Sequence, residues 1–271
     1  MNKLILLYLL ALFSCKKKNN TEPAETKSLT YCDSIPWSPR SYGTVTDIDG
    51  NTYKTIKIGN QTWMAENLRT TRYSNGDLIP YVKGNDEWSN LTTGAYCWYI
   101  DSIDIDDDGT KDYGVSYQEC AGNLYNFYVV EDSRNVCPTG WHVASEAEWE
   151  ELIEFDKQYS GGNVGTSLSP VEGWVLDGFN IGYQFNDELG FRALPIGYRF
   201  GSYYNNQESY SYFGANSLWW TSREPYFSED VLYAFPFVLT TVYEPPSLEI
   251  EFGTGGIYQP GYGLSIRCVK D

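Results

Sequence analysis

Apolar residues recur at helical spacing in one stretch of the chain, residues 145–161, and that stretch predicts its clearest element. Trp149 and Leu152 fall on one face, and glutamates occupy the opposite one. Ser145 followed three residues later by Glu148 is the pattern of a capping box, in which each residue satisfies a backbone N–H of the other. We therefore expect a helix that begins after Ser145 and ends at the glycine pair 161–162, with Trp149 buried.

Strict alternation of apolar and polar residues marks the beginning of the globular part. Three short alternating segments, Thr44–Asp47, Tyr53–Ile58 and Gln61–Met64, are separated by Asp49-Gly50-Asn51 and by Gly59-Asn60. Both separators are strong turn formers. This pattern predicts a three-stranded antiparallel meander.

Further elements follow along the chain. Gly122–Val130 has apolar residues at helical spacing, which predicts a short second helix. Strands are predicted beyond residue 162, at Phe191–Tyr198, Leu218–Ser222, Val231–Leu239, Leu248–Phe252 and Leu264–Val269. Because strands and helices are mixed and no repeat is visible, the sequence favours one α+β domain.

The first residues have the pattern of an export signal. Residues 1–14 combine a lysine with an apolar run that is too short to span a bilayer. Leu12-Phe13-Ser14-Cys15 is similar to the bacterial lipobox, so we expect a signal peptide at 1–14 and a lipid on Cys15; an ordinary secretory signal is the alternative. Residues 15–42 are polar without periodicity and are assigned to a flexible tether, which leaves 43–271 as the domain.

Composition limits the partners. The chain has 42% hydrophobic residues, enough for a buried core, and a formal net charge of −17. So acidic a surface disfavours nucleic acid as a partner. Lys16–Lys18 stand next to the expected lipid, where they could contact anionic headgroups.

The segment Cys137–Leu152, CPTGWHVASEAEWEEL, resembles the signature of the Fibrobacter succinogenes major paralogous domain, a family of extracytoplasmic bacterial modules. Val45–Tyr73 resembles the opening segment of the family. Later family blocks are similar to GAYCWY (94–99), GNLYNFY (122–128), LWWTSR (218–223) and LSIRCV (264–269). The resemblance implies a fold related to C-type lectins and sulfatase-modifying enzymes, with antiparallel sheets, two short helices and long loops.

Cysteine usage agrees with an oxidising compartment. With Cys15 assigned to lipid, an odd number remains: Cys32, Cys97, Cys120, Cys137 and Cys268. The first predicted disulfide is Cys137–Cys268, which would close a long loop. The second is Cys97–Cys120, and it would leave Cys32 unpaired.

Residues able to carry out catalysis are few. His142 is the only histidine, and we interpret it as a structural residue bonded to nearby backbone. Glu148 and Glu151 are expected on a solvated helix face, and the sequence offers only Cys268 where sulfatase-modifying enzymes use a pair of cysteines. The sequence therefore does not predict an enzyme.

Two stretches are candidate binding sites. In the first, aromatic residues alternate with small polar ones, as they do in sugar-stacking surfaces and paratopes; core support is the alternative reading. The candidate ligand contacts are Tyr198, Tyr203, Tyr204, Tyr210, Tyr212, Trp219 and Trp220.

The second stretch resembles the beginning of a calcium loop. Asp104, Asp106, Asp108 and Asp112 stand at positions 1, 3, 5 and 9, with glycine at position 6. Val115 occupies position 12, where such loops carry a glutamate. Calcium binding and a solvated acidic insertion are therefore both open.

Together these features predict a membrane-anchored binding or surface-interaction module of the cell envelope. We expect it at the outer membrane, facing the periplasm or the surface, with a glycan or protein ligand. The alternatives are a sulfatase-modifying type of enzyme and a purely structural envelope lipoprotein.

Overall fold

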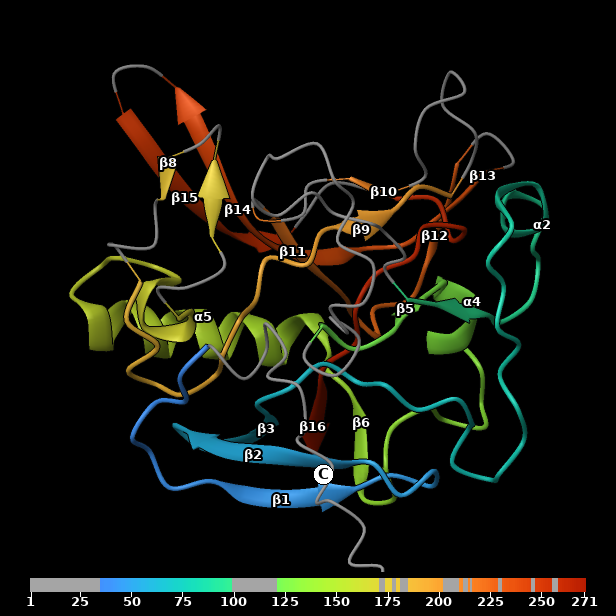
Figure 1. Cartoon of the computed structure of the whole chain (residues 1–271), viewed down its shortest axis with the longest axis horizontal. Coiled ribbons are helices and arrows are strands. Elements are labelled where there is room, and N and C mark those ends of the chain that lie inside the picture. The colour runs from blue at the N-terminus through green and yellow to red at the C-terminus, as the bar shows by residue number, and fades with distance from the viewer. Residues whose placement is uncertain are drawn as a thin grey trace, which may run out of the picture.

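The computed structural model describes residues 35–98, 121–170, 174–176, 179–180, 185–201, 210–211, 214, 216–228, 231–244, 247–254 and 258–271. Within these ranges the chain is an α+β protein, as the sequence predicts. One long helix and several antiparallel sheets are joined by long loops (Figure 1).

A five-stranded antiparallel sheet contains the predicted meander. Its strands are β1 (Gly43–Thr46), β2 (Thr52–Ile58), β3 (Gln61–Met64), β16 (Cys268–Lys270) and β6 (Trp141–Val143). Their order is β1-β2-β3-β16-β6, so the last strand lies between β3 and β6. The meander is confirmed, and β16 joins it to β6.

The long helix α5 (Glu146–Ser160) begins where the sequence predicts. The Ser145 side chain accepts a hydrogen bond from the Glu148 backbone, and the Glu148 side chain accepts one from the Ser145 backbone. Gly161 ends the helix with φ of 69°, a left-handed conformation that favours glycine. The capping box is therefore confirmed.

A second sheet lies on the other side of α5. It consists of β11 (Asn216–Trp220), β14 (Pro236–Glu244) and β15 (Ser247–Thr254), and Figure 1 shows α5 between the two sheets. Trp149 of α5 is 0% exposed and lies with its ring centroid 4.7 Å from those of both Trp63 and Phe237. The predicted burial of Trp149 is confirmed, and it joins both sheets to one core.

The remaining elements are short and support loops. They are α2 (Asn85–Ser89), β4 (Tyr96–Cys97), β5 (Leu124–Tyr125), α4 (Phe127–Val130), the 3-10 turn η1 (Thr166–Leu168), β7 (Val175–Leu176), β8 (Phe179–Asn180), β9 (Tyr198–Arg199), β10 (Tyr210–Ser211), β12 (Tyr226–Ser228) and β13 (Val231–Tyr233). The predicted second helix is present as α4, but its first residues form β5. The short helix α2 around the buried Trp88 is not predicted by the sequence.

The strand predicted at Phe191–Tyr198 is wrong except for its last residue, which begins β9. Arg192 has φ of 58°, outside the extended region. The buried guanidinium of Arg267 donates to the carbonyls of Phe191 and Arg192, at 2.8 and 2.9 Å. These carbonyls accept hydrogen bonds from the Arg267 side chain, and they are not paired with a neighbouring strand.

Two other predicted strands also change. The one expected at Val231–Leu239 is divided into β13 and β14, and Ala234 between them pairs instead with Tyr258. The strand expected at Leu264–Val269 is regular only as β16, preceded by isolated bridges.

The predicted C-terminal boundary of the tether, residue 42, lies too far along the chain, because residues 35–42 are packed against the domain. Ile35 is 2% exposed, and its carbonyl accepts a hydrogen bond from Arg192. The Trp37 ring lies 3.7 Å from Lys54 Nζ, and Arg40 donates to the Glu188 carbonyl at 2.6 Å. Residues 35–42 therefore belong to the folded domain, since they supply buried contacts that a flexible linker would not make.

Candidate functional site

A hollow of about 580 Å³ opens beside α4. Three segments line it: the turn after β3, the residues before β4, and the end of α4 with the loop that follows. The lining residues are Tyr73, Leu78, Pro80, Thr92, Thr93, Gly94, Tyr128, Glu131, Asp132, Ser133 and Arg134. We call this feature the α4 hollow; its size is in the range of small-ligand sites.

Hydrogen bonds hold the three walls together. Ser74 Oγ donates to the Arg134 carbonyl at 2.8 Å, which joins the turn to the loop after α4. The Asn126 side chain donates to the Thr93 carbonyl at 2.8 Å, which joins α4 to the second wall. The hollow is therefore formed before any ligand arrives, and binding costs little ordering.

Arg134 is held by carboxylates on two sides. Its Nε and Nη2 donate to Asp132 at 2.8 and 2.6 Å, and its Nη1 donates to Asp77 at 3.0 Å. Its guanidinium also lies 3.9 Å from the centre of the Tyr73 ring. Hydrogen bonds from Arg134 lower the pKa of Asp132, while burial and the Asp132 charge raise the pKa of Tyr73 to about 12. The Arg134 guanidinium is therefore engaged on both sides, and the two aspartates leave this part of the lining with a net negative charge.

Glu131 and Tyr128 form the more open part of the lining. They stand three residues apart at the end of α4, so their side chains lie on one face. Burial raises the pKa of Glu131, and the neighbouring Asp132 raises it further. Burial also raises the pKa of Tyr128, with Glu131 as a second cause. Glu131 accepts no hydrogen bond from any residue that the structure describes, so its carboxylate can receive a ligand.

His142 lies outside the hollow, on β6. Its Nε2 is 2.8 Å from Glu148 Oε1, and its Nδ1 is 2.7 Å from Asp271 Oδ1. Burial alone would lower the pKa of His142, but the hydrogen bonds to Asp271 and Glu148 outweigh burial and raise it. The expected bond to backbone is wrong, and Glu148 is not a solvated face residue, because the capping box brings its carboxylate to His142.

This histidine cluster is a structural contact between elements. The Ser145 hydroxyl donates to Glu148 Oε2 at 2.7 Å and is therefore part of the helix cap. Both ring nitrogens of His142 face carboxylates, so neither faces a nucleophile among the described residues. The cluster ties β6 to α5 and to the last residue.

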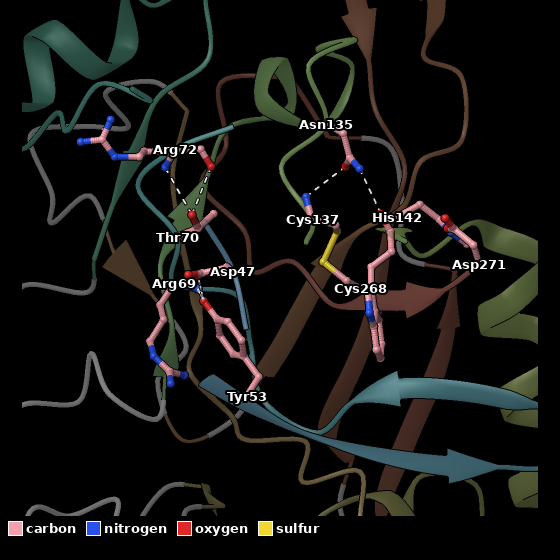
Figure 2. The surroundings of a disulfide bond; sticks show 11 residues. Asp47, Tyr53, Arg69, Thr70, Arg72, Asn135, Cys137, His142, Cys268 and Asp271 are labelled. Atoms are coloured by element: carbon pink, nitrogen blue, oxygen red, sulfur yellow. Dashed lines mark hydrogen bonds and ion pairs between the residues drawn. A yellow bond between two sulfur atoms is a disulfide. The ribbon is translucent and has the colours of Figure 1, made fainter. Parts of the chain in front are cut away.

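The predicted Cys137–Cys268 disulfide is confirmed (Figure 2). Its Cα atoms lie 6.0 Å apart, and it spans a sequence separation of 131 residues. The Asn135 side chain supports the approach to it by accepting from Cys137 N at 3.0 Å. Cys97 is buried at the end of β4, whereas Cys120 and Cys32 lie outside the described residues, so the second predicted pairing stays a prediction.

The two tryptophans predicted as ligand contacts are core residues. Trp219 and Trp220 are both 0% exposed, and their indole N–H groups donate to Asn67 Oδ1 at 2.9 Å and to the Tyr125 carbonyl at 2.7 Å. Tyr198 is 7% exposed. These three predictions are corrected, because the sheet strands that carry the residues face the core.

The other predicted site residues fall outside what can be placed. Tyr203, Tyr204 and Tyr212 lie outside the described residues, and only the backbone of Tyr210 is described, in β10. The predicted calcium ligands Asp104, Asp106, Asp108 and Asp112 and the predicted lipid site Cys15 also lie outside them. Within the described ranges, no group of His, Cys, Asp and Glu side chains is arranged to hold a metal ion.

The α4 hollow is the functional candidate that sequence reasoning missed. Its lining comes from three segments, and each segment alone reads as an ordinary polar loop. One local signal was present: the Asp-Ser-Arg sequence of residues 132–134, in which a carboxylate and a guanidinium two residues apart can pair. Nothing in the pattern brings that pair to Tyr73.

The fold and the hollow define an α+β domain with a preformed, polar surface cavity. The model of the Fibrobacter succinogenes major domain matches residues 56–270, and the chain belongs to this family. Neither a curated protein nor a solved structure matches the chain. Of the helices that the structure describes, none has the length and apolarity to cross a membrane.

Proposed function

We propose that the chain is a lipid-anchored, extracytoplasmic binding module whose α4 hollow holds a carbohydrate. The observation that carries the proposal is the chemistry of the lining. Thr92, Thr93 and Ser133, which carry hydroxyl groups, line the hollow together with Glu131 and the half-buried Tyr128. Sugars offer hydroxyl groups that both donate and accept, together with apolar C–H faces, and this lining can match both.

The disulfide supports a binding role over the alternative of a sulfatase-modifying type of enzyme. The sequence offers Cys268 as the cysteine in the relevant part of the chain, and its sulfur is bonded to Cys137. A thiol in a disulfide is not a nucleophile. A C-type-lectin-like fold remains part of the proposal and rests on the resemblance alone.

The first residues support the proposed location. The apolar run and Cys15 favour export, lipidation and anchoring at the outer membrane. Substitution Cys15→Ser should move the protein from the membrane fraction to the soluble fraction. Unchanged fractionation would reject the lipid anchor without affecting the proposed carbohydrate site.

A glycan array followed by calorimetry tests the binding function. Wild type should bind a subset of glycans, and Tyr128→Ala should weaken that binding by about fivefold, since a stacked ring contributes on the order of 1 kcal/mol. Tyr226→Ala is the matched control, because Tyr226 is 53% exposed and does not line the hollow.

Repeating the array with and without calcium tests the acidic insertion. If the insertion binds calcium near the ligand, affinity should rise with the ion. A wild type that binds no glycan would favour a protein ligand or a purely structural role, and equal loss in Tyr128→Ala and Tyr226→Ala would move the site away from the hollow.

A further inference from the structure

The charge balance of the α4 hollow is uneven. Of the described residues that line it, Arg134 is the one with a positive charge, and Glu131 and Asp132 carry negative charges. Arg134 is already paired with Asp132 and with Asp77 outside the lining. Glu131 therefore remains as an uncompensated carboxylate at the opening.

Among the described residues of this lining, an anionic ligand would find no cationic side chain that is not already paired. The Arg134 guanidinium makes contacts of 2.6–3.0 Å with two carboxylates and also lies over the Tyr73 ring. Releasing it would leave Asp132 without its partner, and that carboxylate accepts from Arg134 through both backbone and side chain. Acidic sugars would also meet the charge of Glu131.

A cationic group has the opposite fit. Glu131 and Tyr128 lie on one face at the end of α4, so one position near both offers a carboxylate and the face or hydroxyl of an aromatic ring. An ammonium group binds well where these two partners meet, through a charge-assisted hydrogen bond and a cation–π contact. Burial and the neighbouring Asp132 raise the pKa of Glu131, and a cation bound beside the carboxylate would favour its charged form.

We propose that the carbohydrate selected by the α4 hollow carries a protonated amine, and that Glu131 is the residue that selects it. This inference rests on the proposed function and deepens it. The ligand class is a sugar with a free amino group, because Thr92, Thr93 and Ser133, whose hydroxyl groups match those of a sugar, line the same hollow.

Paired oligosaccharides test the inference with the full folded domain. The probes are β-1,4-linked oligomers of 2-amino-2-deoxyglucose and their fully N-acetylated counterparts, measured by calorimetry at pH 6, where the amine is protonated. The free-amine oligomer should bind about tenfold more tightly, the size of one charge-assisted hydrogen bond. Added salt should reduce the difference.

Substitutions assign the preference to Glu131. Glu131→Gln should bind both oligomers with similar affinity, whereas Glu150→Gln, on the exposed face of α5, should keep the wild-type preference. Circular dichroism confirms that both variants are folded.

The outcomes separate the two proposals. Equal binding of both oligomers by wild type, with loss in Tyr128→Ala, would overturn the amine preference and leave the carbohydrate site. A preference that persists in Glu131→Gln would overturn the role of Glu131. Binding of neither oligomer, with other glycans bound on the array, would overturn the amine inference alone, and binding of no glycan at all would overturn both.

Discussion

The core around Trp149 and the α4 hollow use aromatic rings in opposite ways. In the core, Trp149 packs against Trp63, Trp219 and Phe237 with no exposed surface. In the hollow, the Tyr73 ring meets the guanidinium of Arg134, whose side chain is 39% exposed. The first arrangement removes apolar surface from water, and the second fixes polar groups at the edge of a cavity.

The difference shows where this protein is stabilised and where it can bind. Burial of several large rings contributes more free energy than exposed ion pairs do, because water competes for the charges. Stability should therefore depend on the core, and ligand binding on the hollow. Substitutions in the two regions should separate these properties.

The largest expected effect is on the core. Trp149→Ala should lower the free energy of unfolding by about 3–5 kcal/mol, because it opens a cavity between both sheets. Chemical denaturation measures this loss. Glu150→Ala, at the next position on the exposed side of α5, is the control and should cost less than about 0.5 kcal/mol. A loss below about 1 kcal/mol for Trp149→Ala would mean that the core is not continuous through α5.

Removal of the disulfide should cause the second-largest loss of stability. Replacing Cys137 and Cys268 together with alanine should cost about 2–5 kcal/mol, since the 131-residue separation is large in the chain-entropy model. Denaturation of the double variant, compared with that of oxidised wild type, measures this cost. If the double variant were as stable as oxidised wild type, the sheet would hold β16 without a covalent link.

A smaller effect is expected in the hollow. Arg134→Ala should lower stability far less than Trp149→Ala, because its ion pairs are exposed to water, which screens them. The same variant should weaken carbohydrate binding, since Asp132 and Tyr73 lose the group that fixes them. Paired denaturation and binding titrations test this separation. A loss of stability as large as that of Trp149→Ala would remove the distinction between the two regions.

The smallest expected effect depends on pH. Glu148 and Asp271 raise the pKa of His142 in the folded state, so the contribution is fully present below the unfolded pKa of about 6.5. It is lost as the pH rises through the folded value. Wild type should exceed His142→Gln by about 0.2–1 kcal/mol at pH 5.5, and the difference should shrink by pH 9. A difference that does not change over this range would mean that His142 stabilises as a neutral group.

Local sequence signals predicted the elements that form the core around Trp149. The capping box at Ser145 and Glu148, the turn residues around residues 49–51 and 59–60, and the apolar stripe with Trp149 place α5 and the meander correctly. Each signal depends on residues within one turn of helix or one hairpin. The Cys137–Cys268 pairing was also predicted, because a bridge between the segment before the helix and the last strand would close a long loop.

Long-range side-chain contacts explain the wrong predictions. Arg267 is 1% exposed and donates hydrogen bonds to the carbonyls of Met64, Phe191 and Arg192. The segment Phe191–Tyr198, which was predicted as a strand, is therefore mostly a loop. Trp219 and Trp220 look like ligand contacts in sequence, but β11 lies against the core and buries both. The pattern of apolar and polar residues in a segment does not show that a distant buried arginine will bond to its carbonyls.

The sequence by itself determined the family, the α+β class, the main helix with its cap and the first sheet, because these depend on near-neighbour spacing and on blocks of residues that stay together in the chain. Only the tertiary structure decided that residues 35–42 are folded and that the α4 hollow exists. Its walls come from segments around Tyr73, Thr93 and Arg134. They meet only because the rest of the core packs, and no local pattern of apolar and polar residues records which distant loops will then lie side by side.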